Sequence, residues 1–185
     1  GAKLAKVSDA PNLPYEFVVL NNDAPNAWAL PGGKIAINIG LLLYLEDEAQ
    51  LAAVLAHEIV HAAARHGASQ ITRGALTNLG LMAIGAGMQG RPNSQLYDAV
   101  FQMGAVAGMA KYGRDDELES DYYGIEYMVR AGYEPNGAVE LQKAFVELNQ
   151  QRQRDFVNGL FASHPPSQKR LEANRLKAKN QPSGI

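Results

Sequence analysis

Residues 47–67 read DEAQLAAVLAHEIVHAAARHG, a stretch with the composition of a long helix. Asp47 and Gln50, three residues apart, match a capping box at its start, and good helix formers follow them. Gly67 matches the glycine that commonly follows the last helical residue. The stretch therefore predicts about five turns of helix that end at His66.

Inside this helix, His57, Glu58 and His61 match the pattern HExxH. Residues four apart share one face of a helix, so both imidazoles can reach one metal ion while Glu58 lies at its flank. Zinc suits such a pair of neutral imidazoles and leaves room for a water molecule. A purely structural zinc site is disfavoured, because such sites usually have four protein ligands and no use for a carboxylate beside the water.

The absence of cysteine decides where a third metal ligand can come from. The 185-residue chain has four histidines and no cysteine, so a transition-metal site must be built from His, Asp and Glu. Glu117 and Asp121, four apart at the start of another predicted helix, present two carboxylates on one face. One could bind the metal while the other accepts a hydrogen bond from a ligand imidazole. The alternative interpretation is a solvated acidic first turn, favoured by the helix dipole.

Strand patterns precede the HExxH helix. Tyr15–Leu20 is a β-branched and aromatic run that predicts a strand. Asn26–Leu30 and Lys34–Ile39 flank a Pro-Gly-Gly turn and predict a hairpin. Further helical patterns occupy residues 69–88, 94–112, 115–131, 137–155 and 167–179.

These elements predict an α+β fold that is mostly α, with a small N-terminal sheet or hairpin packed on the HExxH helix and several further helices. The length predicts a single domain over residues 1–185, and residues 180–185 are expected to be a disordered tail.

Composition excludes several classes of partner. The net charge is −2 with both signs mixed along the chain and no basic stretch, which argues against nucleic acid. No apolar run reaches the length of about 18 residues that a membrane-spanning helix needs. No signal peptide begins the chain, and its first residue, Gly1, is consistent with a targeting segment that has been removed.

Four segments occur in a characteristic order: NAWALPGGKIAINIGLL at 26–42, AHEIVHAAARHG at 56–67, YGRDDELESDYYGIEYM at 112–128 and SHPPSQKR at 163–170. Together they resemble the zinc endopeptidases of peptidase family M48, which include the CAAX prenyl proteases and a bacterial periplasmic quality-control branch. The resemblance covers positions 15–175 and implies a gluzincin-type peptidase domain with one zinc ion per chain. It implies that Glu117 is the third zinc ligand and that Asp121 accepts a hydrogen bond from a ligand imidazole. Ser120 stands where the family usually has alanine.

The resemblance also implies roles for other positions. Lys34–Asn38 corresponds to an edge strand that binds an extended polypeptide substrate by main-chain pairing. His164 would lie near the zinc and either stabilise the oxyanion or occupy the open coordination position in a latent state; the alternative is a loop histidine beside a proline-initiated helix. Arg170, on the following helix, would support this loop or be a solvated charge. His66, in contrast, is interpreted from the residues as the cationic end of the HExxH helix and is left out of the site.

The functional prediction is a zinc-dependent endopeptidase in which Glu58 acts as the base. By resemblance it would cleave misfolded or membrane-associated proteins in envelope quality control. Its expected place is the bacterial periplasm, tethered to the outer membrane or associated peripherally with it or with outer-membrane proteins. The alternative is a non-proteolytic, chaperone-like module that binds unfolded outer-membrane proteins. The intact Glu58 argues against this alternative, because a binding module needs no base.

Overall fold

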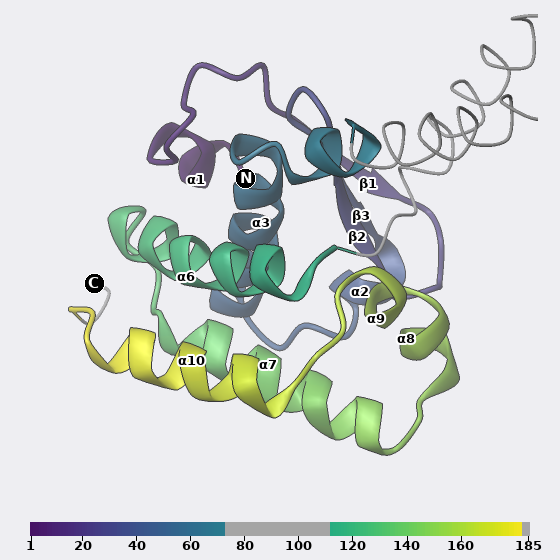
Figure 1. Cartoon of the computed structure of the whole chain (residues 1–185). Helices are drawn as coiled ribbons and strands as arrows, with labels where there is room; N and C mark the ends of the chain where they lie inside the picture. The colour runs from purple at the N-terminus through teal and green to yellow at the C-terminus, as the bar shows by residue number, and fades with distance from the viewer. Residues whose placement is uncertain (73–111, 183–185) are drawn as a thin grey trace, which may run out of the picture.

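The computed structural model describes residues 1–72 and 112–182 (Figure 1). It is predominantly helical with one small sheet, which confirms the predicted α+β, mostly α class. The helices are α1 (Ala2–Lys6), α2 (Ile39–Leu42), α3 (Glu48–Ala63), α6 (Arg114–Arg130), α7 (Asn136–Gln150), α8 (Arg154–Asn158), α9 (Leu160–Ser163) and α10 (Gln168–Lys179). The strands are β1 (Glu16–Leu20), β2 (Ala27–Leu30) and β3 (Lys34–Asn38).

Some predicted elements lie outside the described residues. Of the helices predicted at 69–88 and 94–112, only residues 69–72 and 112 belong to the described part. Residues 69–72 are helical, as part of the segment 66–72, and Tyr112 is not. The predicted tail 180–185 is described only as far as residue 182. No helix of the described residues is long and apolar enough to cross a membrane.

Helix α3 begins as predicted but ends early. Asp47 Oδ1 accepts a hydrogen bond from the backbone N–H of Gln50 at 2.7 Å and caps the helix. The helix ends at Ala63, and Arg65 has a φ of 57°, in the left-handed region that non-glycine residues seldom adopt. The predicted end at His66 with Gly67 as its cap is therefore wrong. His66 instead starts the helical segment 66–72, which leaves α3 at an angle set by the turn at Arg65.

The predicted helix 137–155 is also interrupted. Helix α7 ends at Gln150, Arg152 has a φ of 53°, and the short α8 follows. Neither Arg65 nor Arg152 is a residue type that normally marks a break, which is why helix propensity alone extends both helices too far.

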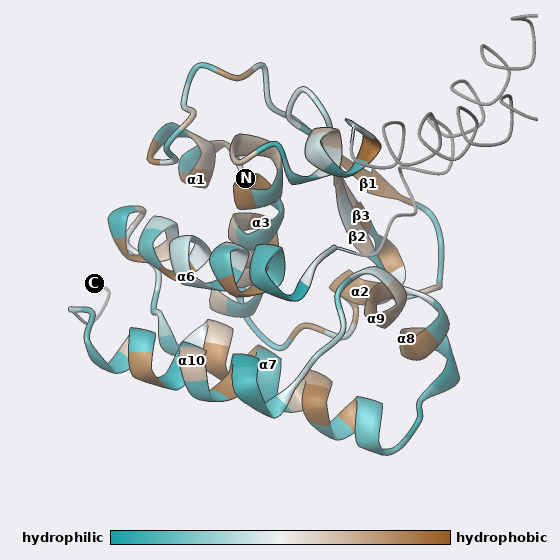
Figure 2. Ribbon diagram, viewed as in Figure 1, coloured by the Kyte–Doolittle hydropathy of each residue, from teal (hydrophilic) through white to brown (hydrophobic). Residues whose placement is uncertain are grey.

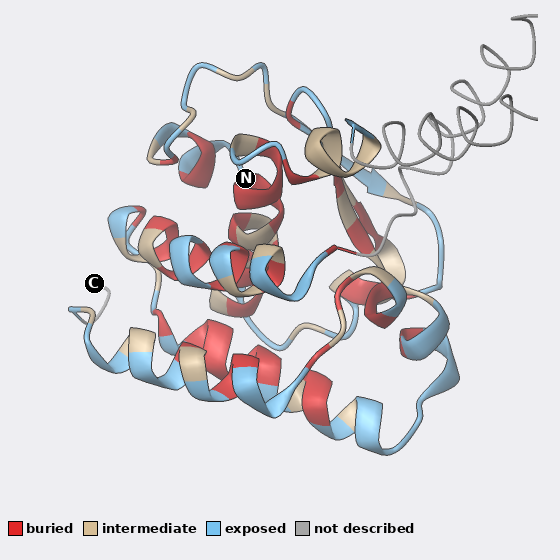
Figure 3. Cartoon of the chain, in the orientation of Figure 1, coloured by how far each residue is buried: buried red, intermediate tan, exposed pale blue. Residues whose placement is uncertain are grey.

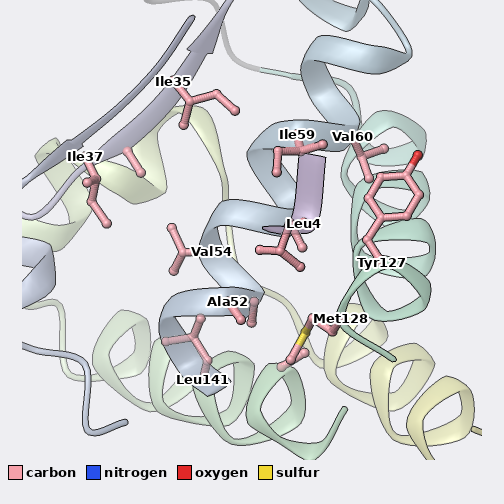
Figure 4. Packing of buried hydrophobic residues seen from close by; sticks show 14 of the residues in the cluster. Leu4, Ile35, Ile37, Ala52, Val54, Ile59, Val60, Tyr127, Met128 and Leu141 are labelled. Atoms are coloured by element: carbon pink, nitrogen blue, oxygen red, sulfur yellow. The ribbon is translucent and has the colours of Figure 1, made fainter. Parts of the chain in front are cut away.

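Helix α3 lies at the centre of the molecule, with the sheet on one side and α6 and α7 on others (Figure 1). Its apolar side chains point in several directions to meet these neighbours (Figure 4). Val54 lies on the side of β3, Ile59 and Val60 lie near Leu4 and Tyr127, and Ala52 lies above Leu141 (Figure 4). A helix buried on most of its circumference is held rigidly, which suits it to position functional groups.

The sheet has the order β1-β3-β2. Strands β2 and β3 form the predicted antiparallel hairpin, with Gly32 and Gly33 at positive φ in the turn, and β1 pairs with β3 in parallel. Lys34–Asn38 is thus the central strand, and the prediction that it is an edge strand is wrong. Local alternation identified the hairpin, but the parallel pairing depends on the chain between β1 and β2 and has no local signal. Among the described residues, β2 and β1 form the two edges.

Helix α10 brings polar residues into the interior. It is largely hydrophilic along its length (Figure 2). Arg170, Leu171 and Asn174 are nevertheless buried on the face that packs against α6 and α7 (Figure 3). A polar residue that is buried normally has a specific partner, so this face indicates a network of polar contacts inside the fold.

Candidate metal centre

The middle of α3 presents two imidazoles toward each other. His57 Nε2 and His61 Nε2 lie 3.0 Å apart, one turn along the same face, as the HExxH spacing predicts. Glu58 is 1% exposed and lies beside them. These three residues belong to the most constrained helix of the fold, so their relative geometry is fixed by the helix itself.

Helix α6 supplies the carboxylates. Glu117 Oε1 lies 3.2 Å from His61 Nε2, and Glu117 Oε2 lies 3.5 Å from His57 Nε2. Asp121, one turn later, places Oδ1 2.9 Å from His57 Nδ1, on the other side of that ring. Gly124 allows this close approach of the two helices, because a Cβ there would lie 3.3 Å from the backbone nitrogen of His57.

His164 follows α9 and completes the cluster. Its Nδ1 lies 3.0 Å from Glu117 Oε1 and 3.3 Å from His57 Nε2, while its Nε2 lies 3.4 Å from Glu58 Oε1. Its side chain is 5% exposed. The structure therefore brings together all six residues singled out in the sequence: His57, Glu58, His61, Glu117, Asp121 and His164.

The donor set fits a metal ion such as zinc. One ligand atom from each of His57, His61, Glu117 and His164 lies within 4.8 Å of the others, and no other group of this kind occurs in the described part of the chain. Two imidazole nitrogens that face each other at 3.0 Å cannot both be satisfied unless a proton or a cation lies between them. Imidazole and carboxylate donors are ligands that zinc binds.

Arg170 connects the two carboxylates to the loop of His164. Its Nε and Nη2 donate to the two oxygens of Asp121, each at 2.7 Å, and its Nη1 lies 2.7 Å from Glu117 Oε2. Nη1 also donates to the carbonyl of Pro165 at 3.1 Å, next to His164. A bidentate guanidinium–carboxylate contact fixes geometry as well as charge. Arg170 thus holds Asp121 in the orientation that meets His57.

The charges of the site shift its pKa values in opposite directions before a metal ion binds. Burial would lower the pKa of His57, but the carboxylates of Glu117 and Asp121 outweigh it and raise the pKa to about 10. Burial holds the pKa of His61 well below its usual range. Burial would raise the pKa of Glu117, but His164, His57 and Arg170 hold it well below its ordinary value. The pKa of Asp121 is likewise lowered, because Arg170 outweighs the effect of burial.

Two further residues contact the cluster, although sequence reasoning did not assign them to it. His66 Nδ1 lies 2.9 Å from His61 Nδ1, so His66 contacts a residue of the cluster, although it is not one of the four residues whose ligand atoms converge. The ring of Tyr112 stacks on that of His61 with 3.8 Å between centroids, and its hydroxyl donates to the carbonyl of Ala29 in β2 at 3.4 Å. Neither contact has a signal in the sequence, because the first depends on the turn at Arg65 and the second joins residues distant along the chain.

Comparisons with known proteins show which family the sequence is similar to. A model of peptidase family M48 matches residues 1–177. The mitochondrial metalloendopeptidase OMA1 of Schizosaccharomyces pombe is 34% identical over 91% of this chain and 48% of the relative. The beta-barrel assembly-enhancing protease of Escherichia coli K12 is 30% identical over 96% of this chain and 37% of the relative. The chain therefore spans less than half the length of these relatives.

The family match includes every residue of the metal centre, from His57 in α3 to His164 after α9. It confirms the resemblance drawn from the four sequence segments. The chain belongs to peptidase family M48.

Proposed function

We propose that this chain is a zinc-dependent endopeptidase domain. The observation that supports this most is the convergence of His57, His61 and Glu117 donors within one buried cluster, with Glu58 at its side. His57, His61 and Glu117 would hold the ion, which leaves a position for a water molecule or a substrate oxygen. When bound, zinc would lower the pKa of that water and polarise the scissile carbonyl.

Glu58 is the proposed general base. Its Oε2 is buried and has no hydrogen-bond partner among the described residues, so it is available to accept a proton. In this proposal Glu58 takes the proton of the attacking water and then gives it to the leaving amine. The rigid position of Glu58 in α3 keeps the carboxylate aligned throughout.

His164 has two proposed roles, and the distances favour one of them in this conformation. Its Nδ1 lies among the ligand atoms, 3.0 Å from Glu117 Oε1 and 3.3 Å from His57 Nε2. This placement supports a latent state in which His164 occupies the open coordination position. Because His164 belongs to the segment after α9 and not to a long helix, a shift of that segment would free the position and leave His164 beside the reacting carbonyl.

The substrate edge is proposed to be β2. Asn26 O accepts from Asn38 N at 2.9 Å, and inward and outward pairing alternate along an antiparallel ladder. Ala27 and Ala29 therefore direct their main-chain groups away from β3, on an edge that pairs with no other strand of the described residues. Both alanines are buried and Ala27 N–H donates to Asn26 Oδ1 at 3.0 Å, so a substrate strand would have to displace these contacts. An extended polypeptide could pair with this edge in a sequence-tolerant way. Tyr112, bonded to Ala29 O and stacked on His61, links the edge to the metal centre.

The name of the E. coli relative supports a narrower proposal, in which the substrates are misfolded outer-membrane proteins of the bacterial periplasm. The chaperone-like alternative would use the same β2 edge without cleavage. The two differ in whether Glu58 matters, because strand pairing alone requires no base.

The test compares the zinc-loaded protein with Glu58→Gln, using casein and an unfolded outer-membrane protein as substrates. We expect Glu58→Gln to bind one zinc ion per chain and to cleave neither substrate. Glu172→Gln, on the exposed face of α10, is the matched control and should cleave normally. Undiminished cleavage by Glu58→Gln would contradict the role of Glu58. Absence of cleavage under every metal condition, both by the wild-type protein and by a His164→Ala variant that cannot occupy the open coordination position, would favour the chaperone-like alternative.

A further inference from the structure

We propose that His66 is a positioning residue for the metal ligand His61. This inference rests on the proposed metal centre, and it assigns to His66 the task of fixing the orientation and the protonated nitrogen of the His61 ring. His66 is itself no ligand in this proposal, because its contact is with the nitrogen of His61 that faces away from the other donors.

The two nitrogens of His61 face different partners. Nε2 points into the donor cluster, 3.0 Å from His57 Nε2 and 3.2 Å from Glu117 Oε1. Nδ1 lies 2.9 Å from His66 Nδ1, and the two rings meet edge to face at 76°. Both side chains are buried, at 1% and 6% exposure, so water does not replace this contact.

Metal binding would set the direction of each hydrogen bond. A neutral His61 that binds through Nε2 carries its proton on Nδ1, which then donates to His66 Nδ1. His66 must therefore carry its own proton on Nε2. That nitrogen faces carboxylates on α6, with Glu119 Oε2 at 3.6 Å and Asp116 Oδ1 at 4.0 Å. Negative charge beside Nε2 favours a proton there. The contacts are therefore consistent with one arrangement, in which His61 is protonated at Nδ1 and His66 at Nε2.

The turn at Arg65 makes this contact geometrically accessible. In an uninterrupted helix, residues 61 and 66 would be separated by about 140° around the axis and their side chains would diverge. The left-handed conformation of Arg65 ends α3 and returns His66 to the ring of His61. A non-glycine residue with φ near 57° is strained and persists where the surrounding structure fixes it.

Tyr112 contacts the face of the His61 ring. It stacks on the face of His61 at 3.8 Å and 24°, whereas His66 meets the edge. Face and edge contacts together define the plane of the imidazole. Removal of the edge contact alone should therefore leave His61 buried but free to change tautomer.

The experiment measures zinc affinity by competition with a chelator for the wild type, His66→Phe and His66→Asn, all combined with Glu58→Gln to prevent self-cleavage. Phe keeps an aromatic ring but has no acceptor, and we expect about 10–100-fold weaker zinc binding. Asn places an acceptor oxygen at the position of Nδ1 and should recover most of the affinity. Long-range ¹H–¹⁵N spectra of the zinc-loaded proteins should show the His61 Nδ1–H tautomer in the wild type and in His66→Asn.

The outcomes separate the inference from the function on which it rests. Equal zinc affinity and an unchanged His61 tautomer in His66→Phe would overturn the inference. A wild-type protein that binds no zinc at one ion per chain would instead refute the metal centre. If His66→Phe does not fold, as judged by circular dichroism, His66→Gln replaces it. Its acceptor is one bond further away, so it should bind zinc more weakly than His66→Asn, and equal affinity would again overturn the inference.

Discussion

The two imidazoles of α3 lie one turn apart, yet their Nδ1 atoms have different hydrogen-bond partners, a carboxylate for His57 and a second imidazole for His61. On the Asp121 side, His57 meets Asp121, which a buried Arg170 clamps through two hydrogen bonds. On the His66 side, His61 meets the imidazole of His66, and the carboxylate of Glu119 beyond that ring is about half exposed. Glu117 lies close to both rings, but only His57 has a second buried carboxylate, that of Asp121, at its other nitrogen. Glu117 and Asp121 together outweigh burial and raise the pKa of His57, whereas burial outweighs Glu117 and lowers the pKa of His61.

The largest effect should come from removal of the buried cation on the Asp121 side. Arg170→Met leaves Asp121 and Glu117 buried without their shared guanidinium. Loss of one partner of a buried ion pair typically costs about 3–5 kcal/mol. We expect a loss of this order in the free energy of unfolding of the zinc-free protein, measured by urea denaturation.

The control is Arg175→Met, on the exposed face of the same helix α10. It should change the free energy of unfolding by less than about 0.5 kcal/mol. Equal destabilisation by the two variants would mean that Arg170 contributes only helix propensity and packing. Its ion pairs with Asp121 and Glu117 would then add no more to the free energy of unfolding than an exposed arginine does.

The next effect concerns zinc affinity. Asp121→Asn keeps an acceptor for His57 Nδ1 but removes the charge, and changes of this kind behind a metal ligand typically cost about 10–100-fold in affinity. We expect a loss in this range by chelator competition. Asp115→Asn, exposed in the first turn of the same helix α6, should bind zinc normally. An unchanged affinity of Asp121→Asn would show that only the hydrogen bond, and not the charge, matters on this side.

A third prediction concerns proton release. At pH 8 the ring of His57 is protonated before zinc binds, because its pKa is raised to about 10, whereas the ring of His61 is already neutral because its pKa is lowered. Since zinc binds neutral imidazole, binding should release about one proton from these two ligands. Zinc affinity should therefore rise with pH up to about pH 10.

Titration calorimetry in buffers of different ionisation enthalpy measures this release. Asp121→Asn should reduce it at pH 8, because the variant removes a charge that raises the pKa of His57. Release of two protons from the wild type would show that the rings of His57 and His61 are both protonated before zinc binds. It would contradict the difference in pKa between the two imidazoles.

Sequence reasoning succeeded where one helix fixes the geometry. His57 and His61 share one face of α3, and Glu117 and Asp121 share one face of α6, because each pair is four residues apart on a helix. It failed where the geometry depends on a turn or on a contact between residues distant along the chain. Helix formers continue through residues 62–66, so the break that returns His66 to the site has no local sign. The parallel pairing of β1 with β3 likewise depends on the path of the chain, and it places β3 in the centre of the sheet instead of at an edge.

The smallest effect should come from the outer carboxylate of the His66 side. Glu119 Oε2 lies 3.6 Å from His66 Nε2 and is about half exposed, so water can replace much of its interaction. Exposed charge pairs contribute about 1 kcal/mol or less, and Glu119→Gln should weaken zinc binding by less than about fivefold. Asp116 also faces His66 Nε2, at 4.0 Å, and compensates for part of the loss. A loss as large as that of Asp121→Asn would mean that His66 transmits a carboxylate charge to His61 as effectively as Asp121 acts on His57. The two imidazoles would then be held by equivalent chemistry, and the distinction between the two sides would be wrong.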